Sequence, residues 1–388
     1  MRAVNDEPNA RAPVRHVAAL DGLRAIAVTS VIVYHGFSTI DHPSLIGRCY
    51  EFVGTAGWAG VDLFFVLSGF LITGILLDSK TKPRFFSTFY IRRTLRIFPL
   101  YYAVLIVVLV IAPHVLSTAD PGVRRILDHQ AWLWTYTANI DVMLNNGWLY
   151  NARWLYLTHL WTLAIEEQFY LVWPLLVKLL PRLALTGVAV FVVIAGPIVR
   201  AVMWHRGVSP KAIYSFTACR LDTLAVGSLL AVLVRARPAY ARRVALGMLA
   251  VGGAALAAVI AVARGLDAFD PTVQIIGFSA LAVLFGGVVL WVTLSRGRVA
   301  RALGSPVPSM IGRYSYGIYL FHYLLVPFYW KIYDVDRVTG VIHSPVLARL
   351  GFTAMILVAT TGVAALSWRF FERPLLALKD RWAPAQRA

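Results

Sequence analysis

An arginine and a histidine in one apolar segment are the first residues whose types and spacing suggest chemistry. Arg24 and His35 both lie in the predicted membrane-spanning helix 18–38. At 100° per residue, their spacing places both side chains within about 20° of one helix face, about 16 Å apart along the axis. Ionisable groups in membrane helices are costly and usually face a polar interior. We therefore predict a catalytic pair: a permanent cation toward the inner side and a general base toward the outer side. The alternative is an ion-paired or snorkelling arginine beside a packed histidine.

A carboxylate in the next predicted span is a candidate partner for that base. Asp62 lies in the predicted span 57–78, at a depth similar to that of His35. Since a carboxylate commonly orients a catalytic imidazole, we predict Asp62 as a catalytic residue that steadies His35. Pairing with Arg24 or Arg220, or contact with outer water, are the alternatives.

The fourth apolar segment carries a histidine and two adjacent glutamates. His159 and Glu166 share a helix face, whereas Glu167 points about 100° away from Glu166. Carboxylates near the middle of a membrane require a buried cation or a proton, and Arg24 or Arg220 is the expected cation. We predict Glu167 as a catalytic residue that steadies the base or the cavity cations, and His159 and Glu166 as cavity residues.

Three arginines stand at the start of the predicted span 97–116. Arg92 and Arg96 are spaced i,i+4, and Arg93 and Arg96 i,i+3, so the side chains share one side of a helix. Guanidinium groups match the geometry of phosphate, so the cluster is a predicted phosphate-binding site. A positively charged anchor at the membrane surface is the alternative.

Further side chains complete the predicted lining of an internal cavity. They are Trp161, Arg220, Asp222, Ser315, Tyr316, Tyr319 and His322. Hydrogen-bonded packing is the alternative for any single hydroxyl among them. The two cysteines, Cys49 and Cys219, have no metal-ligand spacing, so no metal site is expected.

The elements that position these residues follow from composition. The chain has 388 residues, 59% of them hydrophobic and 14% charged, whereas soluble domains have about 45–50% and 25%. The apolar residues form continuous blocks of roughly 20, the length of a membrane-spanning helix, and a β-barrel would alternate instead. We therefore predict an all-α polytopic membrane helix bundle with about ten transmembrane helices. The predicted spans are 18–38, 57–78, 97–116, 156–179, 183–203, 213–234, 243–263, 272–295, 312–333 and 346–370.

The loops between these spans alternate in charge. With the N-terminus in the cytoplasm, about two dozen basic residues fall inside and about eleven outside, while acidic residues concentrate in the outer loops. Membrane orientation thus accounts for the net charge of +18, and nucleic acid is not an expected partner. We predict both termini in the cytoplasm, with a leader at 1–17, a membrane domain at 18–371 and a tail at 372–388.

The predicted outer segment 126–156 is unusually aromatic. It contains Trp132, Trp134, Tyr136, Trp148, Tyr150, Trp154 and Tyr156. Trp and Tyr favour the interface between water and lipid, so we predict an interfacial or re-entrant segment that covers part of the bundle. An aromatic belt with no role in binding is the alternative.

Six motifs in order resemble the membrane acyltransferase family 3, whose members O-acylate cell-envelope glycans. The motifs are Leu20–Ala27 with His35 after it, Gly60–Phe70, Arg92–Pro99, His159–Tyr170, Ser315–His322 and Phe370–Pro374. Each is modest alone, but six in family order over almost the whole chain are specific. Many members carry a fused extracytoplasmic esterase-like domain, and this chain resembles the single-domain members.

The resemblance implies an acyl-CoA donor, most often acetyl-CoA, bound from the cytoplasm as a co-substrate, with no permanently bound cofactor. It marks Arg24 and His35 as the family's key pair and places donor binding at Arg92, Arg93 and Arg96. We expect an O-acyltransferase of a bacterial cytoplasmic (inner) membrane that acylates a hydroxyl of a cell-envelope glycan or lipid-linked saccharide. In that scheme the base takes the hydroxyl proton, and the buried arginine stabilises the oxyanion or holds the donor. A covalent acyl-histidine is the alternative route.

Two other functions use the same residue types. Buried histidine, arginine and glutamate also build proton relays in secondary transporters, although the sequence shows no clear inverted repeat. Acylation of a small intracellular acceptor such as a macrolide would use the same chemistry, but the acceptor would enter from the cytoplasmic side of the membrane. Donor-dependent transfer by purified protein separates enzyme from transporter, and loss of envelope O-acylation on gene deletion argues against the intracellular acceptor.

Overall fold

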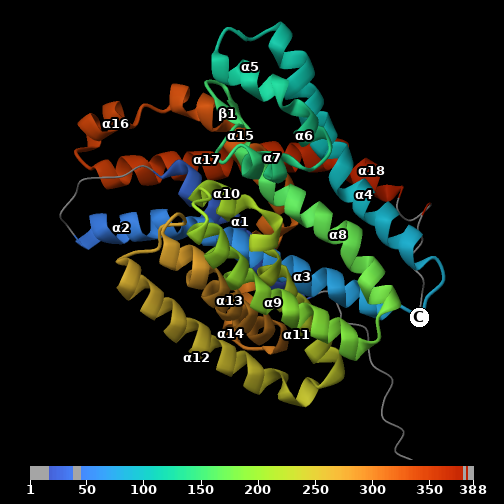
Figure 1. Ribbon diagram of the computed structural model, residues 1–388. Coiled ribbons are helices and arrows are strands. Elements are labelled where there is room, and N and C mark those ends of the chain that lie inside the picture. Colours follow the sequence, from blue (N-terminus) through green and yellow to red (C-terminus); the bar gives the residue numbers. More distant parts are fainter. Residues whose placement is uncertain (1–16, 38–44, 379–381, 383–388) are drawn as a thin grey trace, which may run out of the picture.

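The computed structural model describes residues 17–37, 45–378 and 382, and nearly all of them are helical (Figure 1). The sheet within this part of the chain is one antiparallel hairpin of β1 (Asn151–Ala152) and β2 (Leu155–Tyr156). The predicted all-α bundle is confirmed. Residues 1–16 of the predicted leader, and residues 379–381 and 383–388 of the predicted tail, lie outside the described residues.

Seven helical segments of the described chain are long and apolar enough to cross a membrane, and each overlaps a predicted span. They are α1 (Ala18–Gly36); α2 (Leu45–Ala56) continued by α3 (Gly60–Ser79); α4 (Phe85–Leu105) continued to His114; α9 (Arg182–His205); α12 (Pro238–Ala263); Val273–Leu294, which ends in α13 (Phe278–Leu294); and α17 (Pro345–Ser367) continued by α18 (Arg373–Ala377). Short 3₁₀ or π turns within or beside the long helices cover Gly57–Ala59, Ile106–Ile111, Ala112–His114, Thr158–Leu160, Thr217–Cys219, Val273–Gly277 and Trp368–Glu372. The chain is a multi-pass membrane protein.

The other three predicted spans are also helices, but they are shorter or more polar. They are α8 (Trp161–Leu179), α11 (Leu221–Ala236) and α15 (Pro306–Ile332). The first carries two glutamates and a lysine, and the second has 16 residues. Two of these three helices carry the polar side chains of the cavities described below, which explains their lower hydropathy.

Two of the predicted spans are wrong in ways that change where site residues lie: one helix starts earlier than predicted, and another is broken. Helix α4 begins at Phe85 rather than at residue 97, so the arginine cluster lies inside the helix instead of at its mouth. The sixth predicted span is broken between α10 (Pro210–Ser215) and α11, and Arg220 is the N-cap of α11. At this break, backbone N–H and C=O groups lack partners within a helix, and the charged side chain of Arg220 lies where a continuous apolar helix was predicted.

Three helix ends that the charge pattern assigns to one side of the membrane lie together. The Lys80 ammonium donates to the carbonyl of Leu180 at 2.6 Å, and that of Lys178 donates to the carbonyl of Lys80 at 2.8 Å. Arg235, at the end of α11, pairs with Asp78, at the end of α3, at 2.6 Å. Three chain segments predicted to face the cytoplasm therefore meet at one end of the bundle.

Small residues let the central helices approach closely. A Cβ added to Gly69 of α3 would collide with the backbone oxygen of Leu224 in α11, and one added to Gly227 would collide with that of Val66. Glycine at such crossings is the usual device for close packing in membranes. Helix α1 packs against both α3 and α15. This packing brings the polar side chains of α1, α3 and α15 together.

Shorter helices complete the structure. They are α5 (Pro121–Asp128), α6 (Gln130–Trp134), α7 (Ala138–Leu144), α14 (Arg298–Leu303) and α16 (Val335–Ile342). Figure 1 shows α5 at the top of the view, with the hairpin, α6 and α7 below it; α7 packs against α8 and α10, and β2 against α15. The predicted outer segment therefore covers part of the bundle, as expected.

Candidate active site

Three adjoining cavities follow one path through the bundle. The central cavity is lined by Arg24 of α1, and by residues of α3, α4, α8 and α15. It shares Arg93 and Arg96 with a second cavity, the mouth, which extends to Lys82 near the end predicted to be cytoplasmic. It shares Val61 and Tyr319 with a third, the outer cavity, which contains His35. The predicted stripe from Arg24 to His35 thus lines two neighbouring cavities.

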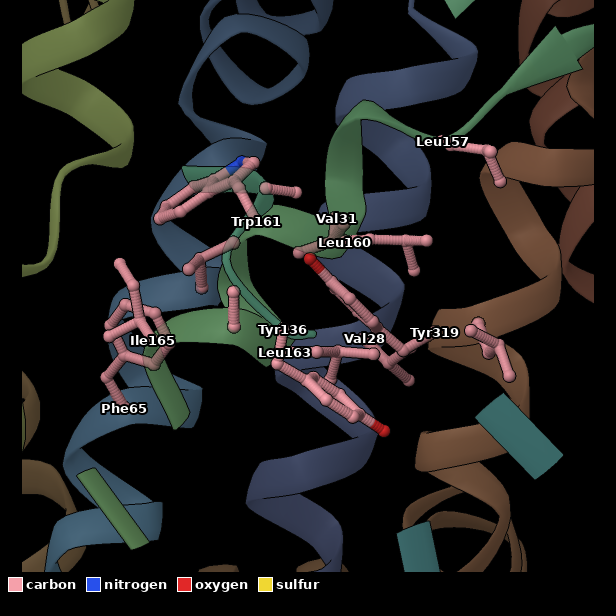
Figure 2. Packing of buried hydrophobic residues seen from close by; sticks show 14 of the residues in the cluster. Val28, Val31, Phe65, Tyr136, Leu157, Leu160, Trp161, Leu163, Ile165 and Tyr319 are labelled. Carbon is pink, nitrogen blue, oxygen red and sulfur yellow. The ribbon is translucent and has the colours of Figure 1, made fainter. Parts of the chain in front are cut away.

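Tyr319 stands between the central and outer cavities. Figure 2 shows its side chain reaching from α15 toward the start of α8, near Leu160 and Val31. Its hydroxyl lies 2.7 Å from that of Thr162 and donates to the carbonyl of His159 at 3.1 Å. These hydrogen bonds hold the Tyr319 ring in place at the boundary that the central and outer cavities share.

His35 is held by a second histidine, not by a carboxylate. Its Nδ1 lies 2.9 Å from Nε2 of His322, and Nδ1 of His322 lies 2.6 Å from the carbonyl oxygen of Tyr319. His322 is fully buried on α15. The sequence predicted His322 as a cavity residue. Its hydrogen bond to His35 was not predicted, because no spacing along the chain indicates that contact.

The hydrogen-bond order fixes the tautomer of His35. A carbonyl oxygen can only accept, so Nδ1 of His322 carries the hydrogen and its Nε2 accepts. Nδ1 of neutral His35 must then donate to His322, which leaves the lone pair on Nε2 of His35. Because His35 lines the outer cavity, that lone pair is available to a hydroxyl bound there.

Aromatic side chains from several elements enclose the outer cavity. They are Tyr34, Trp58, Trp148, Trp161, Tyr214, Phe269, Tyr319 and Tyr323. The ring of Tyr323 lies 4.0 Å from that of His35, and Asn151 of β1 donates to its hydroxyl at 2.8 Å. The outer segment therefore contributes residues to the cavity that holds His35. The predicted cavity residues His159 and Trp161 also line it, and Nε2 of His159 donates to the carbonyl of Leu320 at 3.2 Å.

A buried aspartate anchors this outer segment. Asp141 accepts from Asn145 Nδ2 at 2.8 Å, lies 2.8 Å from Nδ1 of His129, and accepts a short bond from the Tyr150 hydroxyl. Burial and this carboxylate raise the pKa of Tyr150, because both disfavour the phenolate. The hairpin is thereby tied to the helices that precede it.

The paired glutamates of α8 have different partners. Glu166 lies 3.6 Å from Nη2 of Arg93 and accepts from the Tyr170 hydroxyl at 2.5 Å. The guanidinium of Arg93 also stacks on the Tyr170 ring at 3.8 Å. The sequence predicted a cation, Arg24 or Arg220, or a proton for these carboxylates; the ion-pair partner of Glu166 is Arg93, and the charge of Arg24 also interacts with Glu166. Because α4 begins at Phe85, Arg93 lies inside the helix rather than before it, and its side chain can reach Glu166.

The central cavity presents polar atoms that the described residues leave unpaired. Oε1 of Glu167, Nε of Arg93 and Oγ of Ser315 are buried without a hydrogen-bond partner, and all three residues line this cavity. Leaving such a group unpaired costs about 1–3 kcal/mol, so a polar ligand or ordered water is expected there. Arg24 adds a guanidinium, whose charge interacts with those of Asp21, Arg93 and Glu166. Tyr316 lines the same space.

Asp62 belongs to an ion pair behind the site. Its Oδ1 accepts from Nη2 of Arg220 at 2.9 Å, and both side chains are fully buried. The Arg220 guanidinium also lies over the ring of Phe278 at 4.1 Å. Of the alternatives weighed for Asp62, pairing with Arg220 is the one found, and His322 contacts His35 instead. Arg220 does not line the three cavities.

A second buried ion pair lies beside the first. Asp222 accepts from Nη1 and Nη2 of Arg200 at 2.9 Å, and Arg200 also donates to Ser279 at 2.6 Å. The sequence named Asp222 as cavity lining, but it stabilises the contact of α9, α11 and α13. Arg200 was missed, although an arginine near the end of an apolar span is a signal that could have found it.

The arginine cluster of α4 lines the mouth. Arg92, Arg93 and Arg96 all line it, together with Lys82 and the indole of Trp368. The cluster therefore connects the end of the bundle predicted to be cytoplasmic with the central cavity. Among the described residues, four cationic and no acidic side chains line this cavity, so it suits an anionic ligand.

Comparison with known proteins identifies relatives of the whole described bundle. The profile of the family described as "Acyltransferase domain" matches residues 17–368. A peptidoglycan O-acetyltransferase OatA of Listeria monocytogenes is 29% identical over 93% of this chain and 56% of its own length. The putative peptidoglycan O-acetyltransferase YrhL of Bacillus subtilis is 26% identical, and the O-acetyltransferase OatA of Staphylococcus aureus is 27% identical. Both align over 93% of this chain, with 55% and 57% of their own lengths covered.

The chain thus spans about half the length of the curated relatives it matches. No solved structure matches it significantly.

Proposed function

This chain belongs to the acyltransferase domain family, and we propose that it is an integral-membrane O-acyltransferase that moves an acetyl group from acyl-CoA to a hydroxyl of a cell-wall glycan. The observation that carries this proposal is the path of three adjoining cavities, from four cationic side chains at the mouth to His35, whose Nε2 the hydrogen bond to His322 leaves as an acceptor. A donor and an acceptor that approach from opposite ends of this path meet near Tyr319.

The mouth supports acyl-CoA as the donor. The phosphates of coenzyme A would bind the guanidinium groups of Arg92, Arg93 and Arg96, and Trp368 offers an aromatic face beside them. The pantetheine arm would extend into the central cavity. Its amide groups provide donors and acceptors for Glu167 and Ser315, whose buried atoms lack partners.

The outer cavity supports a saccharide as the acceptor. Aromatic faces beside a few hydrogen-bonding groups form a surface on which a sugar ring packs, and the relatives named above are O-acetyltransferases of peptidoglycan. The acceptor hydroxyl would donate to Nε2 of His35. Its oxygen attacks the thioester carbon as the proton passes to His35, and collapse of the intermediate expels the thiolate, which takes the proton from the imidazolium of His35 to leave as the thiol.

Two further groups act on charges that develop in this reaction. Arg24, which lines the central cavity, would stabilise the oxyanion or hold the donor. When His35 becomes an imidazolium, its Nδ1–H stays bonded to His322, which keeps the ring in place. With the mouth in the cytoplasm, the enzyme would work in the cytoplasmic membrane of a bacterium, where acyl-CoA is inside and the wall outside.

Binding of the donor tests the proposal. Acetyl-CoA titrated into detergent-purified protein should give saturable heat, and Arg93→Ala with Arg96→Ala should weaken binding by roughly 100-fold or more, since each removes a charge-assisted contact of about 1.5–3 kcal/mol. The matched control is Arg298→Ala with Arg301→Ala, two exposed arginines of α14 that line none of the three cavities. Wild-type protein that is folded but binds no short-chain acyl-CoA would exclude this donor.

A further inference from the structure

A long apolar groove lies on the surface of the bundle, away from the candidate active site. Its floor is α11 from Val226 to Ala236, and its walls are the start of α9 and the start of α12. Helix α9 packs on α11, whereas α12 packs chiefly on α13, so the first turns of α9 and α12 stay apart. The groove is open to the surface and has a volume of about 650 Å³.

The charges of the groove are all at one end. Arg182 begins α9 and Arg237 joins α11 to α12, and both line the groove; its other lining residues are uncharged. Both arginines lie at the same end of the bundle as the contact between Lys80 and Leu180. Within the described part of the chain, the residues that line the groove include no acidic side chain beside these two arginines.

The dimensions fit one leaflet of a bilayer. From Val226 to Arg237 the floor rises about 16 Å at 1.5 Å per residue, close to half of the roughly 30 Å hydrocarbon core. Apolar side chains of both walls face outward, and Leu183 is 85% exposed. In a membrane, the groove opens toward lipid tails along its length and toward headgroups at its arginine end.

We propose that this groove is a binding site for one phospholipid with an anionic headgroup. The phosphate and the headgroup charge contact Arg182 and Arg237, and an acyl chain lies along α11 between α9 and α12. Basic residues near an anionic lipid surface contribute about 1 kcal/mol each. Two of them therefore predict a preference for anionic over zwitterionic lipid of roughly 30-fold.

Competitive lipid binding tests this site. Purified full-length protein in detergent is mixed with equal amounts of phosphatidylglycerol and phosphatidylcholine that have the same acyl chains, and bound lipids are counted by native mass spectrometry. Wild type should retain phosphatidylglycerol at least tenfold better. Arg182→Gln with Arg237→Gln should reduce the ratio to near one, because the acyl-chain contacts alone do not distinguish the headgroups.

The matched control removes the same charge from the same helices. Arg206→Gln with Arg264→Gln changes exposed arginines just beyond the other ends of α9 and α12, and should keep the wild-type ratio. Ala236→Trp places a bulky ring on the groove floor and should reduce retention of both lipids. Equal retention of the two lipids by wild type, or an unchanged preference in the Arg182 and Arg237 variant, would contradict the proposed site.

Discussion

Replacing His35 with alanine is expected to abolish acyl transfer while leaving the protein folded and able to bind the donor. General-base catalysis typically contributes 10²–10⁴-fold, so kcat should fall by at least 100-fold. Donor affinity should change little, because His35 lies in the outer cavity and the arginine cluster lies in the mouth. The measurement is release of free coenzyme A and acetylated acceptor by purified protein, with donor affinity determined in parallel.

Variants of His322 separate positioning from general-base action. His322→Gln retains an oxygen that can accept from Nδ1 of His35, whereas His322→Phe cannot accept, so the glutamine variant should keep more of the activity. Both variants keep Nε2 of His35, and both should be more active than His35→Ala. Wild-type turnover by His35→Ala, or a phenylalanine variant as active as wild type, would contradict these roles.

Breaking the ion pair between Asp62 and Arg220 should cost more stability than any other single change considered. Removing one partner leaves the other charge buried and unpaired, which destabilises by about 3–5 kcal/mol. Arg220→Ala is therefore expected to lower the unfolding temperature strongly in detergent, and Asp62→Ala similarly. The measurement is thermal unfolding followed by tryptophan fluorescence.

The double variant Asp62→Leu with Arg220→Met is the control for this pair. Apolar replacement of both partners removes both buried charges, so it should recover most of the lost stability. The same double variant also tests the role first predicted for Asp62. If it is stable and active, Asp62 acts through folding; if it is stable but loses activity as completely as His35→Ala, Asp62 takes part in catalysis.

The sequence predicted the membrane helices well because the signal for them is local. A block of about 20 apolar residues has one stable form in lipid, and each predicted range contains a helix. The errors occur where polar residues interrupt the pattern. The start of α4 is rich in charge and was placed outside the predicted span 97–116, and the break at Arg220 was predicted as continuous helix.

The site was predicted as a set of residues but not as a set of contacts. Arg24 and His35 share a helix, so their common face follows from helical geometry. The pairing of Glu166 with Arg93, and of Asp62 with Arg220, depends on how three or more helices pack, and spacing along the chain does not contain that information. For the same reason the contact between His35 and His322, which lie on α1 and α15, could not be read from the sequence.

The most direct test of the account places the two substrates on opposite faces of a sealed membrane. Proteoliposomes enclose an oligosaccharide of the cell-wall type, and acetyl-CoA is supplied only outside, where it reaches the mouth of those molecules whose Lys80 end faces outward. The account predicts that acetylated oligosaccharide accumulates inside with wild-type protein and is absent with His35→Ala. Acetylation that requires both substrates on the same face would contradict a path through the three cavities.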